Sequence, residues 1–222
     1  MLHEELTEAA GPVLAKVQDH PFWAGLRDGS LPGVSLAHFV EQDTGYLLPA
    51  YARALARCAA TANDDGHAIL FARSAASTLD ARDRLQASYT ELAPGLGLPA
   101  LHEHAPVDPA THAHASFFTA AGVKAPYTGI GALLPMVWFN FHVSNDLVER
   151  AVPDSRYMPW IEAYHPGESY QYAVHAFLDA VDGIGETCTA RQREEITGQF
   201  RLGVRYEWAF AESSLRRPVW PV

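Results

Sequence analysis

The sequence has 222 residues, of which 48% are hydrophobic and 19% are charged, a composition typical of one folded domain and not of a disordered chain. Its formal net charge of −10 disfavours binding to nucleic acid or to an anionic membrane surface. Cys58 and Cys188 are too few and too far apart for a disulfide framework or a zinc site. The first residues lack the pattern of a signal peptide, and no apolar run is long enough to span a membrane, so we expect a cytoplasmic protein.

Helical periodicity dominates the chain from end to end. Apolar residues recur at three- and four-residue spacing, and alternating strand patterns are missing. Ser35, Thr111 and Thr189 are expected N-caps, and the segment from Pro94 to Pro99 is an expected break. The expected helices span, in chain order, residues 2–18, 22–26, 36–62, 67–92, 111–121, 127–150, 153–164, 167–183 and 190–216. The sequence therefore predicts an all-α fold, a single helical bundle over residues 1–222 with room for a small molecule between its helices.

Asp43 lies in the middle of an otherwise apolar helical run, and Tyr46 follows it three residues later. In an α-helix this spacing puts both side chains on one face. A carboxylate is costly to bury unless it has a partner, so its place here needs an explanation. One interpretation is a carboxylate and a phenol directed at a polar ligand. The other is a solvated helix face with Tyr46 at its edge, and the spacing alone does not decide between them.

Glu207 stands among aromatic residues of the last expected helix, with Phe210 one turn further on. If Glu207 is buried, desolvation raises its pKa and suits it to act as a general acid near neutral pH. The alternative is an exposed ion pair with Arg201 or Arg205.

Met136 and Asn140 are one helical turn apart and directly follow Pro135, whose kink can open a cavity. By pattern alone, the more ordinary interpretation is a core methionine and a polar spacer.

Several segments, in their order and spacing, resemble the TenA/thiaminase II family. They are His20–Pro21–Phe22, Asp28 to Pro32, Phe39 to Asp43, Tyr51 to Ala54, Leu133 to Trp138, Trp160 to Tyr164 and Tyr206 to Phe210. The resemblance implies a haem-oxygenase-like helical fold without haem or another cofactor, assembled as a homo-oligomer, a dimer or a tetramer. It also implies a pocket for an aminopyrimidine and hydrolysis of a C–N bond, in thiamin or in an aminomethyl-aminopyrimidine derived from it.

The resemblance also assigns roles to individual residues. Asp43 matches the pyrimidine-binding aspartate, and Glu207 matches the glutamate that handles protons for the leaving amine. The other expected substrate-binding residues are Tyr46, His114, Met136, Trp138, Asn140, Tyr164 and Phe210.

Three positions depart from the family pattern. Met136 stands where the family has its nucleophilic cysteine, and His114 and Asn140 stand where it has tyrosines. A thioether forms no thiolate, so the covalent route is closed. We therefore expect a pocket for a flat, amine-bearing heterocycle, weak or absent thiaminase activity, and a water-mediated hydrolysis in which His114 assists Glu207. A ligand-binding or regulatory protein without catalysis is the alternative.

A metal-dependent oxidase on the same fold is a further alternative. Its ligands would be Glu168, His175, Asp179 and Asp182 on one late helix. The early Glu and His pair that a di-iron site also requires is missing, so we expect no metal.

Overall fold

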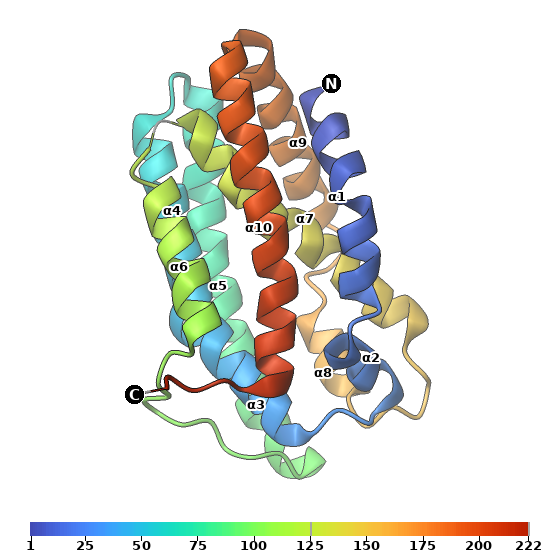
Figure 1. Cartoon of the computed structure of the whole chain (residues 1–222). Helices are drawn as coiled ribbons and strands as arrows, with labels where there is room; N and C mark the ends of the chain where they lie inside the picture. The colour runs from blue at the N-terminus through green and yellow to red at the C-terminus, as the bar shows by residue number, and fades with distance from the viewer. Residues whose placement is uncertain (125, 222) are drawn as a thin grey trace.

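The computed structural model describes residues 1–124 and 126–221, and within these residues it contains helices and no strand (Figure 1). The prediction of an all-α fold is confirmed. The elements, in chain order, are α1 (Leu2–Gln18), α2 (Pro21–Asp28), α3 (Gly33–Gln42), η1 (Asp43–Leu47), α4 (Leu48–Thr61), α5 (Asp65–Leu96), α6 (Pro109–Ala121), α7 (Pro126–Arg150), α8 (Met158–Tyr164), α9 (Tyr170–Thr187) and α10 (Ala190–Arg216). None of the helices in the described ranges is both long and apolar enough to cross a lipid bilayer.

The segment expected as one helix over residues 36–62 is a continuous helical path that contains a π-helical turn, η1. The Leu48 N–H group donates to the Asp43 carbonyl, and the Thr44 hydroxyl donates to the Val40 carbonyl at 2.7 Å. Such turns insert an extra residue into a helix and occur often at functional sites. Here the inserted turn begins at Asp43, one of the two carboxylates singled out by sequence.

Helix ends differ from the expectation at several places. Helix α5 passes through Pro94 and ends at Leu96, four residues later than expected, and its C-cap Gly97 has a φ of +62° that suits glycine. Helix α3 begins before Ser35, and Asp108, not Thr111, caps α6 by accepting from the Thr111 N–H group at 2.8 Å. The expected cap at Thr189 is confirmed.

Helices α8 and α9 are also displaced from the expected ranges. They span Met158–Tyr164 and Tyr170–Thr187 instead of residues 153–164 and 167–183. In both cases the residues after the proline or glycine form turns before the helix begins.

Helix α10 runs along the whole bundle and packs against α7, while α4 packs against α5 (Figure 1). The two helices approach closely at Gly131 of α7, where an added Cβ atom would be 2.9 Å from the Ile196 Cα atom of α10. Ile196 is fully buried, so neither backbone can yield. This contact fixes the position of α10, which carries Glu207, relative to α7, which carries Met136.

A Gly131→Ala variant should therefore be destabilised by about 2–3 kcal/mol, because overpacking of two helix backbones is costly. The matched control is Gly198→Ala on α10, where an added Cβ meets nothing within 4 Å. That exposed helical position should gain about 0.5–1 kcal/mol. Urea unfolding followed by circular dichroism measures both, and equal stabilities for the two variants would contradict this packing.

Candidate functional site

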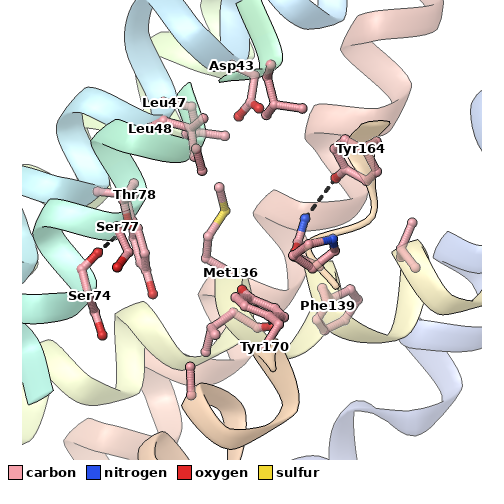
Figure 2. A pocket seen from close by; sticks show the side chains of 18 of the residues that line it. Asp43, Leu47, Leu48, Ser74, Ser77, Thr78, Met136, Phe139, Tyr164 and Tyr170 are labelled. Atoms are coloured by element: carbon pink, nitrogen blue, oxygen red, sulfur yellow. Dashed lines mark hydrogen bonds between the residues drawn. The ribbon is translucent and has the colours of Figure 1, made fainter. Parts of the chain in front are cut away.

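A cavity of about 870 Å³ lies between the helices of the bundle. Its wall is formed by residues from α1, α2, α3, η1, α4, α5, α7, α8, α9 and α10 and from the loop before α9. Figure 2 shows Asp43 on one side, Tyr164 on a second, and the hydroxyl-bearing residues Ser74, Ser77 and Thr78 of α5 on the opposite wall. The volume is in the range of pockets that enclose small organic ligands.

Two carboxyl groups from distant parts of the chain line this cavity. Asp43 comes from η1 and is 5% exposed, and Glu207 comes from α10 with a side chain 12% exposed. Burial alone raises the pKa of the Asp43 carboxyl, with no hydrogen bond contributing, and the Oε1 atom of Glu207 is buried without a partner. Arg201 and Arg205 are both exposed, so the surface ion pair considered for Glu207 is wrong. Buried carboxyl groups without partners mark a site built for a ligand.

Both carboxyl groups hold their protons more tightly than usual. Burial raises the pKa of Asp43 to about 7. Burial, and next the nearby charge of Asp43, raises the pKa of Glu207 to about 8. Near neutral pH each group can therefore give or accept a proton, which is the property required of a general acid or base.

The raised pKa values predict how stability depends on pH. The unfolded chain loses these two protons at its ordinary values, 3.8 and 4.5, whereas the folded protein holds them to about 7 and 8. Their contribution to stability is therefore complete below pH 4 and is lost as the pH rises to about 8. The difference in unfolding temperature between the unchanged chain and an Asp43→Asn/Glu207→Gln double variant should therefore decrease as the pH is raised from 5 to 9. A difference that stays constant over this range would contradict the raised pKa values.

Aromatic and amide side chains form the wall next to Asp43. The Asn140 amide donates to the Tyr164 hydroxyl at 3.0 Å, the bond drawn in Figure 2. Phe39 packs against Phe210 with ring centroids 5.3 Å apart, and Trp23 lies 5.9 Å from the Tyr164 ring. Flat apolar walls with a few polar groups suit a planar heterocycle.

Met136 of α7 also lines the cavity, and Figure 2 shows its sulfur directed into it. Neither cysteine does. Cys58 is buried elsewhere, with its pKa raised by burial to about 11, and Cys188 follows the end of α9. Among the described residues the cavity wall therefore contains a thioether and no thiol.

Three of the expected pocket residues do not line the cavity. Tyr46 donates its hydroxyl hydrogen to the Ala105 carbonyl in the loop before α6. The reason is the π turn, in which residues three apart no longer share a face. Trp138 is two residues from Met136, hence on another side of α7, and it packs edge-on against His142 at 4.7 Å.

His114 is the third of these residues. It is 1% exposed and lies beyond Glu207, with its Nε2 atom 3.9 Å from the Oε1 atom. His114 was expected to contact the ligand, but it does not line the cavity and belongs to the layer of side chains around it.

The alternative metal ligands do not converge. Glu168, His175 and Asp179 are exposed on the outside of the bundle. Asp182 accepts a hydrogen bond from the His3 backbone and pairs with the His3 ring at 2.6 Å. In the parts of the chain that the structure describes, no three His, Cys, Asp or Glu side chains are placed to hold a metal ion.

Other residues of the wall were not expected from sequence. Tyr51 and Tyr170 line the cavity, and their hydroxyl groups donate to the backbone carbonyls of Leu133 and Val137 at 3.1 and 3.5 Å. Tyr51 falls within a segment that resembles the family, and this resemblance could have identified it as a residue of the cavity wall. The hydroxyl-bearing residues of α5 carried no such sequence signal, because serines on an Ala- and Arg-rich helix are typical of an exposed face.

Comparison with known proteins shows which family the chain belongs to. The model of the TENA/THI-4/PQQC family matches residues 8–217. The chain belongs to this family. The resemblance to TenA proteins that the sequence segments indicated is therefore confirmed at the level of family membership.

Two characterised relatives cover most of the chain. The thiamine biosynthesis multifunctional protein ThiED of Corynebacterium glutamicum is 28% identical over 212 residues, which are 95% of this chain and 26% of that protein. The chain thus spans about a quarter of this relative. The aminopyrimidine aminohydrolase of Bacillus subtilis is 26% identical over 205 residues, 90% of this chain and 84% of that protein.

Solved structures agree on the fold. A TenA homologue from P. horikoshii OT3 superposes with a TM-score of 0.80 at 22% identity, covering 98% of this chain and 100% of that one. A domain with a heme oxygenase-like fold from Shewanella denitrificans gives a TM-score of 0.69 at 11% identity, covering 96% and 92%. The expected haem-oxygenase-like fold is confirmed.

Proposed function

We propose that this chain binds an aminopyrimidine-like small molecule in the cavity and hydrolyses its exocyclic C–N bond without a thiolate nucleophile. The observation that carries the proposal is that the carboxyl groups of Asp43 and Glu207 line one aromatic-walled cavity, with Asp43 buried and the Oε1 atom of Glu207 buried and unpartnered. The family membership and the name of the Bacillus subtilis relative support the substrate class. A flat heterocycle with amino groups supplies the N–H donors that both carboxyl groups lack.

Asp43 would bind the heterocycle by accepting N–H hydrogen bonds from its amino group and ring. Ligand N–H groups would satisfy the carboxylate, and the positive charge of an amine would favour its ionised form. Tyr164 and Asn140 would add polar contacts beside it, and Phe39 and Phe210 would pack against the ring.

Glu207 would handle the protons of the reaction. In its protonated form it donates a proton to the departing amine, whose bond to the methylene carbon breaks. Water forms the new bond to that carbon, and the Glu207 carboxylate takes a proton from the water. The products are the hydroxymethyl compound and ammonia, and Glu207 ends in the protonated form in which it began.

Met136 would shape the pocket in place of a nucleophile. Because its thioether has no ionisable proton, it leaves water as the attacking group. We infer that Met136 occupies the position of the family's cysteine, and this makes slow hydrolysis the expected behaviour.

Ammonia release tests the function directly. Purified protein incubated with 5-aminomethyl-4-aminopyrimidine at pH 7.5 should release ammonia faster than buffer alone, and the compound should raise the unfolding temperature. A protein that neither releases ammonia nor shows a thermal shift with this compound would overturn the proposal. A thermal shift without ammonia would leave a binding protein and remove the hydrolytic step.

A further inference from the structure

The layer of side chains beyond Glu207 contains an unusual buried pair. His114 of α6 is 1% exposed, and neither of its ring nitrogens has a hydrogen-bond partner among the described residues. The Oε1 atom of Glu207 is also buried and unpartnered. These two unsatisfied groups face each other, with 3.9 Å between Nε2 and Oε1.

The distance between His114 Nε2 and Glu207 Oε1 indicates that the two groups are close to, but not within, hydrogen-bonding range. It is too long for a hydrogen bond, which spans about 2.7–3.2 Å, and too short for a water molecule that bonds to both atoms. A buried polar group without a partner is destabilising, so a hydrogen bond between the two groups would be favourable on both sides. Hydrogen bonds of catalytic groups are often long in ligand-free proteins and shorten when the charge or the ligand arrives.

The ring of His114 is held in place by its neighbours. Tyr206 stacks on it with centroids 5.0 Å apart and an interplanar angle of 13°, and Phe118 packs on it at 4.4 Å. Burial lowers the pKa of His114 to about 3, so the imidazole is neutral at any pH at which the protein would work. A neutral imidazole has one N–H group, and Nε2 is the nitrogen that faces a carboxyl oxygen.

We propose that His114 is a positioning residue for Glu207, whose Oε1 atom accepts a hydrogen bond from the His114 Nε2–H group once the carboxyl ionises, leaving Oε2 free to face the cavity. The negative oxygen attracts the N–H group and closes the gap. When Glu207 is protonated, the attraction is lost and the pair relaxes to the spacing seen in the structure. The catalytic meaning of this pair rests on the proposed function, whereas the hydrogen bond itself requires only that Glu207 ionises.

Other groups also face Glu207 and influence its ionisation. The charge of Asp43 opposes it, and the hydroxyl groups of Tyr51 and Tyr170 already donate to backbone carbonyls. Titratable groups that interact electrostatically with Glu207 are Asp43 from η1, Tyr51 from α4, Tyr164 from α8 and Tyr170 from α9, and His114 from α6 lies beside it. His114 is thus the neutral donor available on the side of Glu207 away from the cavity.

Carboxyl ¹³C NMR tests this proposal on the full chain, without any ligand. The protein is labelled at the glutamate side-chain carboxyl carbon, and the Glu207 signal is assigned by its loss in Glu207→Gln. His114→Phe keeps an aromatic ring but removes the donor, and should raise the titration midpoint of Glu207 by about one pH unit. His114→Tyr restores an O–H donor and should return the midpoint toward that of the unchanged chain.

A midpoint that is the same in the unchanged chain and in His114→Phe would overturn the proposal. If His114→Phe does not fold, His114→Leu takes its place as the donor-free variant, and circular dichroism checks each variant. This result does not depend on the proposed function. If the aminopyrimidine does not bind, that function is refuted, but the titration midpoints still decide whether His114 contacts ionised Glu207. If the compound does bind, the pH at which its affinity is half-maximal should rise in His114→Phe and not in His114→Tyr.

Discussion

A Glu207→Gln variant should hydrolyse 5-aminomethyl-4-aminopyrimidine about 100-fold or more slowly than the unchanged chain, because a positioned general acid and base typically contributes about 10²–10⁴-fold. The amide keeps the shape of the side chain but cannot donate a proton to the departing amine or take one from water. Initial rates of ammonia release at saturating compound measure the effect.

The same variant should be more stable at pH 8, by about 1–3 kcal/mol, because it removes a buried and unpartnered carboxyl group. A loss of rate together with a gain in stability separates a site built for function from one that maintains the fold. The matched control is Glu194→Gln on the exposed side of α10, which should change neither quantity. An unchanged rate in Glu207→Gln would remove Glu207 from the mechanism.

A Met136→Cys variant should hydrolyse the same compound at least about tenfold faster than the unchanged chain, equal to about 1.4 kcal/mol of activation free energy. Its sulfur would enter the cavity from the position that Met136 occupies in Figure 2. A thiol can form a thiolate that adds to the pyrimidine ring and divides one difficult step into two easier ones. The other pocket groups, Asp43 and Glu207, would already be in place.

Met136→Leu is the control for this gain, because it keeps an apolar side chain of similar volume and adds no thiol. Alkylation with iodoacetamide should abolish the activity gained by Met136→Cys, while Cys58, which is buried and has a raised pKa, should react slowly. Equal rates for the Cys and Leu variants would show that the position does not support a nucleophile.

The sequence predicted the helical fold and the two carboxyl groups because each prediction depended on a pattern that tertiary structure preserves. Helical periodicity survives in every long element, although prolines and caps moved the ends by a few residues. Asp43 and Glu207 stood out because a carboxylate within an apolar or aromatic helical run is costly to bury unless it has a partner, and the family resemblance then assigned both to the pocket. Their convergence in one cavity needed the coordinates.

Local departures from α-helical geometry explain the side chains that were misplaced. Tyr46 lies within a π turn that the sequence does not reveal, so the α-helical spacing rule predicted the wrong neighbours for its side chain. Trp138 matched a family segment but lies on a side of α7 away from the cavity. The α5 wall was missed for the opposite reason, since Ser74, Ser77 and Thr78 look like surface residues in the sequence but line the cavity in the structure.

Calorimetric titration of 5-aminomethyl-4-aminopyrimidine between pH 6 and 9 tests most directly the claim that Asp43 and Glu207 together receive an amine-bearing heterocycle. Binding should tighten as the pH rises through about 7 and 8, where the two carboxyl groups ionise. Asp43→Asn should weaken binding about tenfold or more at pH 8, since a hydrogen bond to a charged group is worth about 1.5–3 kcal/mol. Binding that is independent of pH and equally tight in Asp43→Asn would contradict the account.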